Sequence, residues 1–346
     1  SWRYIFFVPL PLITIALALG VIFMPSVRSK ERPKFDWAGY LLICITLFCL
    51  VSALSNGQKL GWLSDHISGL LAISVIGSAA FLWSQSKAQN PLLDLQLFRV
   101  PAFASACLIA FIFGMGNFAT TYAVPVFGQL VQGLSATDAG MLMMPAGLIV
   151  AFALPFTGRL ADRSKPHYII ICGLFFFFLG TALLGGADAN TPFWHVAFFG
   201  MVSRFGMSFI MPSVMSTALK AVPPERLNSA GGAVNFVRQL GGSLGTNFYV
   251  VLLSLRTQFH SDALASTQIS GNAASQELLV GVGGILSVAG VPEAMHQSGA
   301  LHYLGQVVHA QASTLGFQDG FLIIATVFLA AMLPAWVLGR AQAARP

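Results

Sequence analysis

Residues Asn228–Gly245 read N-S-A-G-G-A-V-N-F-V-R-Q-L-G-G-S-L-G. On a helix, five of these residues fall on one face, because they are spaced alternately four and three positions apart. They are Gly231, Asn235, Arg238, Gly242 and Gly245. Glycines on one helix face let a second helix or a ligand approach the backbone. We therefore predict that Gly231, Gly242 and Gly245 pack against a neighbouring helix.

Arg238 lies in the middle of this face, and the residues that follow it, Phe248–Leu255, are almost wholly apolar. About ten residues into a helix, a side chain lies roughly 15 Å from the helix end. This depth is near the midplane of a bilayer whose hydrocarbon core is about 30 Å thick. Because ionisable groups at that depth are costly and usually functional, Arg238 is a candidate functional residue. The alternative is that Arg238 only bonds to another helix and stabilises the bundle.

The composition of the whole chain favours an all-α polytopic membrane protein. Of its 346 residues, 56% are hydrophobic and only 9% are charged, whereas soluble domains have about 25% charged residues. The net charge of +6 comes from basic residues in alternate loops, so we expect a lipid bilayer and no nucleic acid as a partner. The four cysteines lie inside apolar runs, and their spacing fits neither a metal site nor a disulfide in an exterior loop.

Nine apolar segments are candidates for crossing a bilayer, which takes about 17–25 residues. They are Tyr4–Met24, Trp37–Leu54, Gly69–Ser84, Pro101–Val126, Ala139–Phe156, Tyr168–Leu184, Phe193–Leu219, Ser229–Leu255 and Gly320–Leu338. The long hydrophilic region Arg256–Asp319 contains one further apolar run, Leu278–Val291. This run is short for a crossing, so we interpret it as a helix in the loop or at the membrane interface.

Lysine and arginine are concentrated in alternate loops. The basic loops are Pro25–Asp36, Gln85–Val100, Thr157–Pro166, Lys220–Asn228 and the C-terminal tail, and each loop between them carries at most one basic residue. Basic loops lie in the cytoplasm, so we expect a cytoplasmic C-terminus and an exterior Ser1. The chain has neither an initiator methionine nor a signal peptide. We therefore expect a fragment, preceded by an odd number of further spans.

A charged motif, Gly158-Arg159-Leu160-Ala161-Asp162-Arg163, follows the fifth predicted span. We expect a tight turn at Gly158, followed by opposite charges that can pair across helix ends. Such pairs can close a cytoplasmic gate and break when the gate opens, which makes Gly158, Arg159, Asp162 and Arg163 candidate gate residues. The alternative is an ordinary positively charged loop.

Three further features of the spans concern ligands and helix ends. Arg204 is a second deep charge, and Asn117 and Tyr122 lie on the fourth span. Aromatic and methionine side chains near them, such as Phe113, suit either a pocket for varied apolar ligands or ordinary core packing. The sequence Ser135-Ala136-Thr137-Asp138 has capping-box spacing, so we predict that Asp138 marks a helix start and does not carry a proton.

The sequence contains no set of residues typical of an enzyme. No Asp or Glu lies deep in a predicted span, and no Walker-type loop, catalytic triad, metal site or cofactor motif is present. A proton-driven carrier needs a buried carboxylate or histidine. The coupling group is therefore expected in sequence outside this chain, unless the coupling does not use protons.

Several of these stretches resemble one family. The opening Ser1–Phe7 resembles the start of the sixth span of fourteen-span major facilitator drug–proton antiporters of the EmrB/QacA type, and Asn235–Gly245 resembles their thirteenth span. Gly158–Arg163 is similar to the cytoplasmic loop motif of that superfamily in its C-terminal-half copy, and Pro91–Arg99 is similar to the linker before its C-terminal bundle. The resemblance implies a partial major facilitator fold, with nine of fourteen transmembrane helices and two bundles that rock about a central cavity.

The resemblance also implies a division of the chain. Residues 1–24 would be the last helix of the N-terminal bundle, and residues 25–100 two extra central helices with cytoplasmic linkers. Residues 101–346 would be the C-terminal six-helix bundle, with a long exterior loop at about 256–319. In that layout the cavity wall would contain Asn117, Tyr122, Arg204, Asn235 and Arg238. The acidic residues that couple protons in this family lie mostly in the first bundle.

The function implied by the resemblance is efflux of small amphipathic drugs in exchange for protons, by a multi-pass protein of the bacterial cytoplasmic (inner) membrane. Because the exterior loop resembles that of members that work with a periplasmic adaptor protein, an adaptor is a candidate partner. One alternative is a same-fold exporter of a single metabolite, such as a siderophore or an antibiotic. A different class of protein is a non-transporting membrane scaffold or sensor, in which Arg238 could be replaced without loss of flux.

Overall fold

The computed structural model describes residues 2–23, 35–269 and 271–343, and within them the regular elements are all helices. The chain divides into two compact units, residues 1–36 and 37–346. The first unit contains the short 3-10 helix η1 (Trp2–Phe6) and the helix α1 (Pro9–Phe23). The basic residues of the first predicted cytoplasmic loop, Arg28, Lys30, Arg32 and Lys34, lie outside the described residues.

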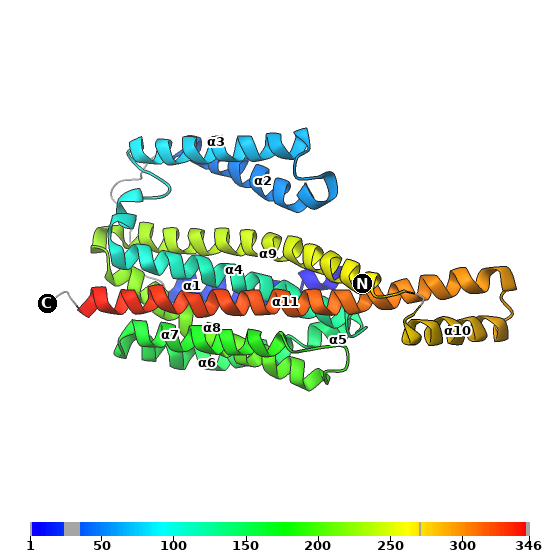
Figure 1. Ribbon diagram of the computed structural model, residues 1–346. Helices are drawn as coiled ribbons and strands as arrows, with labels where there is room; N and C mark the ends of the chain where they lie inside the picture. The colour runs from blue at the N-terminus through cyan, green and yellow to red at the C-terminus, as the bar shows by residue number, and fades with distance from the viewer. Residues whose placement is uncertain (1, 24–34, 270, 344–346) are drawn as a thin grey trace. The chain divides into compact units, whose positions relative to one another are not determined.

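The second unit contains the remaining helices (Figure 1). In chain order these are α2 (Trp37–Leu60), α3 (Asp65–Lys87), η2 (Leu95–Arg99), α4 (Pro101–Leu130), α5 (Ala136–Met141), α6 (Met144–Arg163), α7 (Pro166–Leu184), α8 (Phe193–Lys220), η3 (Pro224–Arg226), α9 (Leu227–Ser266), α10 (Ala273–Val288), η4 (Glu293–Met295) and α11 (His296–Ala343). In this unit α4 packs against α8, α9 and α11, while α2 and α3 form a pair that touches α9.

Seven helices of the described residues are long and apolar enough to cross a membrane. Two of the nine predicted spans are not among them. The first corresponds to α1, which has only 15 described residues. The second corresponds to α9, whose 40 residues are ample in length but include the glycines and polar residues of the Asn228–Gly245 stretch. Crossing by α1 and α9 therefore stays a prediction.

The fifth predicted span begins where the capping pattern indicated. The hydroxyl of Ser135 accepts a hydrogen bond of 3.1 Å from the backbone N–H of Asp138 and donates one of 2.7 Å to its carboxylate. Ser135 is thus the N-cap of α5, which confirms the prediction that Asp138 marks a helix start. The span is interrupted after six residues, because the chain turns at Leu142 and Met143 before α6 begins.

Aromatic rings from three helices form much of the core. Phe177 of α7 stacks on Phe328 of α11 with ring centroids 4.0 Å apart, and it meets Phe113 of α4 edge-on at 6.4 Å. Edge-to-face and offset-stacked rings are favourable arrangements of the aromatic quadrupoles. Phe113 is only 1% exposed, so it belongs to the core and does not line a ligand pocket.

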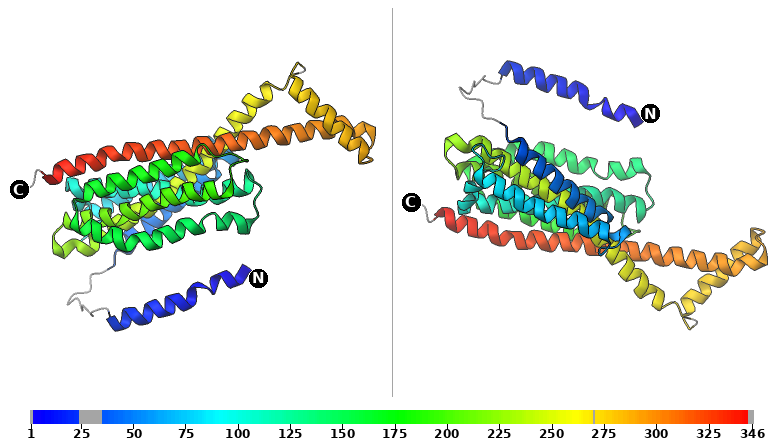
Figure 2. Two further views of the ribbon diagram at one scale, coloured as in Figure 1. Left: turned by 90° about the horizontal axis from the view of Figure 1, so that it is seen from below. Right: turned by 90° about the horizontal axis from the view of Figure 1, so that it is seen from above.

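The region expected as a long exterior loop, Arg256–Asp319, is helical over most of its length, and α10 (Ala273–Val288) covers most of the apolar run that was interpreted as a helix within it. The position of this region outside the membrane stays a prediction. α9 continues to Ser266, α10 follows, and α11 has already begun at His296. In Figure 2 the end of α9 diverges from α11, and α10 returns from there to the start of α11. Polar side chains are compatible with a helix whose surface faces water. The side chain of Asn272 also caps α10, because it accepts hydrogen bonds from the backbone N–H groups of Ala274 and Ser275.

Candidate functional site

Arg204 of α8 is the most deeply buried charge among the described residues, with 9% of its surface exposed. Its guanidinium donates hydrogen bonds to the side-chain oxygen of Asn117 and, at 2.5 Å, to the hydroxyl of Thr121, both on α4. It also approaches the sulfur of Met207 at 3.7 Å. The structure thus brings together two predicted cavity residues, Arg204 and Asn117. Thr121 and Met207 were not predicted, although each lies one helical turn from a predicted residue.

The partners of Arg204 are all neutral. Among the residues that the structure describes, no carboxylate forms an ion pair with it. A buried arginine stays charged, so its cost of desolvation must be offset by hydrogen bonds to dipoles. The hydroxyl of Thr121 also donates a bond of 2.6 Å to the backbone oxygen of Asn117, which fixes its lone pairs toward the guanidinium. The α4–α8 contact therefore holds a positive charge in a neutral polar setting.

Asn235 and Arg238 lie on α9 and form a separate pair. The guanidinium of Arg238 reaches the side-chain oxygen of Asn235 at 3.4 Å, and the Asn235 amide donates to the backbone oxygen of Gly231 at 3.2 Å. The Nε atom of Arg238 is buried and has no hydrogen-bond partner among the described residues. No hydrogen bond between described residues joins this pair to Arg204 or Asn117.

Tyr122, the remaining predicted cavity residue, follows Thr121 on α4 and is 37% exposed. Neighbouring positions on a helix point about 100° apart, so the Tyr122 ring and the Thr121 hydroxyl face different directions. Tyr122 is therefore placed beside the Arg204 cluster and not within its hydrogen bonds.

The glycines of α9 differ in how closely α4 approaches them. A Cβ atom added at Gly242 would lie 2.6 Å from the ring of Phe118, and one at Gly245 would lie 2.4 Å from the Cα of Met115. At Gly231 the only atom within reach is a methyl group of Leu219 at 4.0 Å, which is ordinary contact. The α4 side contributes a glycine of its own, because a Cβ atom at Gly114 would lie 2.1 Å from the backbone oxygen of Arg238.

The predicted gate motif has a different backbone from the one expected. α6 runs without interruption through Gly158 to Arg163, so the prediction of a tight turn at Gly158 was wrong. Gly158 is not among the described glycines with positive φ, and a single glycine is tolerated inside a helix at a cost of about 1 kcal/mol. Arg159 and Arg163 are exposed on the last turns of α6. The side chain of Asp162 lies outside the described residues, so its pairing stays a prediction.

A charged cluster that was not predicted joins α9 to α11. One carboxylate oxygen of Asp319 accepts from Nε of Arg256 at 2.7 Å and lies 2.6 Å from Nε2 of His260. The Arg256 guanidinium also lies 4.8 Å from the centre of the Phe259 ring. Arg256 and His260 are one helical turn apart, and this spacing was visible in the sequence. Their partner Asp319 lies about sixty residues away, and no pattern in the sequence indicated the pairing.

Comparison with known proteins decides the family. The model of the Major Facilitator Superfamily matches residues 1–246. This chain belongs to the Major Facilitator Superfamily. Membership confirms the resemblance at the level of the superfamily. The assignment to the EmrB/QacA branch, with nine of fourteen spans, stays a prediction.

Several curated proteins that resemble this chain are named as resistance proteins, and others are named only as MFS-type transporters. This chain is 28% identical to the lincomycin resistance protein LmrB of Listeria monocytogenes over 254 residues, and the aligned region covers 73% of this chain and 54% of LmrB. It is 25% identical over 342 residues to multidrug resistance protein 3 of Bacillus subtilis, covering 96% of this chain and 63% of that protein. It is also 28% identical over 250 residues to multidrug resistance protein Stp of Mycobacterium tuberculosis, covering 71% and 45%. The chain thus spans about half the length of the relatives it matches.

A solved structure supports the fold. A bacterial homologue of the human lysosomal transporter Spinster, in an inward-facing and occupied conformation, superposes with a TM-score of 0.51 at 15% identity. The match covers 88% of this chain and 65% of that chain. At this identity the similarity concerns the fold alone, and it agrees with an all-helical major facilitator architecture.

Proposed function

We propose that this chain is the C-terminal part of a proton-coupled efflux transporter that exports small amphipathic drugs by alternating access. The observation that carries the proposal is the buried hydrogen-bonded cluster of Arg204, Asn117 and Thr121 between α4 and α8. A buried charge that is satisfied only by neutral groups is an expensive feature for a protein that merely needs to fold. The names of the relatives, which are multidrug and antibiotic resistance proteins, support the same substrate class.

In this proposal the α4–α8 cluster and the α9 pair form parts of one cavity wall. Asn117, Tyr122 and Arg204 would contact the substrate from one side, and Asn235 and Arg238 from the other. The buried Nε of Arg238 lacks a partner among the described residues, which suits a carboxylate supplied by sequence outside this chain or by the substrate. A carboxylate supplied by the protein would also be the proton-coupling group. The close glycine contacts between α4 and α9 would let these helices rock as one body.

The layout of the transporter follows from the same proposal. Residues 1–24 would complete an N-terminal bundle, residues 25–100 would supply two central helices, and residues 101–346 would form the C-terminal bundle. The C-terminus and the Gly158–Arg163 motif would lie in the cytoplasm, with α10 outside. The protein would reside in a bacterial cytoplasmic (inner) membrane and would work with a periplasmic adaptor protein if the α9–α11 extension docks one.

The proposal is tested by drug-triggered proton flux in inverted membrane vesicles that contain the full-length protein carrying this chain. An antiporter gives a flux that depends on an amphipathic drug and that collapses in the Arg238→Ala variant. Equal flux in the native protein and in the variant would support an exporter but contradict a role for Arg238 in its substrate cavity. Absence of flux with amphipathic cations and acids alike would favour the exporter of a single metabolite, and absence of any bound substrate would favour a scaffold or sensor.

A further inference from the structure

The helices α9 and α11 separate at one end of their contact and leave a hollow there. They are held close by two glycines of α11, since a Cβ atom at Gly320 would lie 2.7 Å from the ring of Tyr249 and one at Gly316 would lie 2.6 Å from the hydroxyl of Thr257. The end of α9 diverges from α11 (Figure 2). The space between them, together with the end of α4, is a cavity of about 410 Å³. This volume lies within the range of small-molecule sites.

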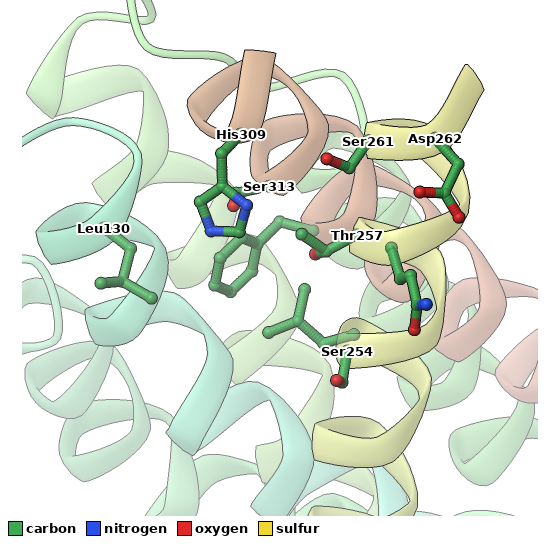
Figure 3. Close-up of a pocket in the computed structure, with 10 residues that line it drawn as sticks. Leu130, Ser254, Thr257, Ser261, Asp262, His309 and Ser313 are labelled. Atoms are coloured by element: carbon green, nitrogen blue, oxygen red, sulfur yellow. The ribbon is translucent and has the colours of Figure 1, made fainter. Parts of the chain in front are cut away.

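The cavity, which we call the α9–α11 groove, is lined by polar and apolar side chains (Figure 3). The polar side chains include Ser254, Thr257, Ser261 and Asp262 on α9, and His309 and Ser313 on α11. The apolar side chains include Leu130 and Phe317. In Figure 3 Thr257 and Ser261 of α9 lie across the hollow from His309, and Leu130 lies on a third side. Asp262 lies farther out on α9, where its side chain is exposed. A small ligand could therefore be held by hydrogen bonds at its edges and by apolar contact along its carbon skeleton.

The charge of the groove restricts the class of ligand. Its lining includes the carboxylate of Asp262 but no lysine or arginine. The sequence contains no lysine or arginine between Arg256 and Arg340, so the stretches of α9 and α11 that follow Arg256 and line the groove carry neither. Arg256 itself is engaged by Asp319 and by the ring of Phe259. Among the described residues, Asp262 forms no ion pair, which leaves its carboxylate free for a ligand.

We propose that the α9–α11 groove binds a small hydrophilic cation, namely a protonated amine that also carries hydroxyl groups. The ammonium group would donate charge-assisted hydrogen bonds to Asp262. The ligand hydroxyls would exchange hydrogen bonds with Thr257, Ser261 and Ser313, and its carbon atoms would face Leu130 and Phe317. This site shares no residue with the Arg204 cluster or with the Arg238 pair, so it is a second site and does not depend on the proposed function.

The groove is preformed in the described structure. Asp319 holds Arg256 and His260 of α9 through contacts of 2.7 Å and 2.6 Å, just beside the point where the helices diverge. The preceding residue of α11, Gln318, donates a hydrogen bond of 3.0 Å to the backbone oxygen of Ala187 and so fixes α11 to the loop between α7 and α8. A site whose walls are already positioned loses less free energy to ordering when the ligand binds.

The test is binding of three matched polyols to the full-length protein purified in detergent, measured by saturation-transfer NMR and calorimetry. N-methylglucamine is the cation, sorbitol the neutral analogue and gluconate the anion. We expect N-methylglucamine to bind best. Asp262→Asn should weaken it by about tenfold, the value of one charge-assisted hydrogen bond. The control is Glu277→Gln, which removes an exposed carboxylate of α10 outside the groove and should leave binding unchanged.

A second variant tests the location of the site. Ser313→Leu places an apolar side chain in the groove and should abolish binding, while circular dichroism and the elution volume report whether the protein still folds. Equal binding of sorbitol and N-methylglucamine, or equal binding in Asp262→Asn and Glu277→Gln, would overturn the cation preference. Absence of saturable binding, or binding that survives in a folded Ser313→Leu variant, would overturn the site. Drug-triggered proton flux is a separate measurement, so failure here leaves the proposed function standing.

Discussion

The guanidinium of Arg204 on α8 donates a hydrogen bond of 2.5 Å to the hydroxyl of Thr121 on α4. The same guanidinium bonds to Asn117, one turn earlier on α4. Two helices that are far apart in sequence are thus joined by a charge inside a bundle that otherwise packs through aromatic and small side chains. This relationship gives the first prediction.

Arg204→Lys should fail to replace the native residue, because an ammonium group cannot reproduce the planar fork that reaches Asn117 and Thr121 together. We expect drug efflux to fall at least as far as in Thr121→Val, which removes one acceptor and keeps the arginine. Efflux of a fluorescent substrate from cells is the measurement. As a control, Arg226→Lys alters an exposed ion pair with Asp94 and should change little. Normal efflux by a fully expressed Arg204→Lys protein would contradict a role for this cluster in transport.

Substitution of two glycines of α9 should have opposite effects on stability. Gly245→Ala places a methyl group 2.4 Å from the backbone of Met115, so it should destabilise the α4–α9 contact by about 1–3 kcal/mol. Gly231→Ala meets only Leu219 at 4.0 Å and should stabilise the helix slightly, by about 0.5–1 kcal/mol. The melting temperatures of the purified variants give the comparison. If both variants melt at the same temperature, the close approach of α4 to Gly245 is not present in solution.

Asp319→Asn should loosen the attachment of α9 to α11, because the neutral amide is a poorer acceptor for Arg256 and His260. The charged groups are partly exposed, so we expect a loss of about 1 kcal/mol or less. The change should be visible as faster hydrogen exchange in residues 256–266 and little change in α7. Glu277→Gln is again the matched control. Unchanged exchange in this part of α9 would show that glycine packing alone joins the two helices.

Asp188, in the loop between α7 and α8, should titrate below its usual range. The Thr191 hydroxyl, at 2.8 Å, is the main cause that lowers the pKa of this carboxyl, and backbone N–H groups add to it. A carboxyl whose pKa is lower in the folded state than in the unfolded state stabilises the folded protein at pH values above the unfolded-state pKa. This stabilisation is lost as the pH falls through the folded-state pKa. Thr191→Val should therefore raise the pKa and reduce the acid sensitivity of the loop. An NMR titration of labelled aspartate carboxyls in the native protein and in the Thr191→Val variant provides the measurement.

The sequence by itself determined the class of protein and many helix positions. A chain with 56% hydrophobic and 9% charged residues can bury its backbone in a bilayer only as helices or a closed barrel, and its long unbroken apolar runs select helices. The cap at Ser135 was also predictable, because its hydrogen bonds join residues three positions apart. Features of this kind depend only on residues that are close in the sequence. The geometry of a single helix fixes how such residues are placed relative to one another.

Only the tertiary structure decided which of these residues meet. Gly231 and Gly245 are equivalent in the pattern of α9, yet only Gly245 lies against α4, because the helices approach closely over a limited length. Arg204 and Asn117 were both candidates, but their hydrogen bond depends on how α8 packs against α4. Asp319 contacts Arg256 and His260 across about sixty residues of sequence, and this pairing depends on how α11 packs against α9. Contacts between helices follow from the shapes of whole packed surfaces, and no local pattern in the sequence contains that information.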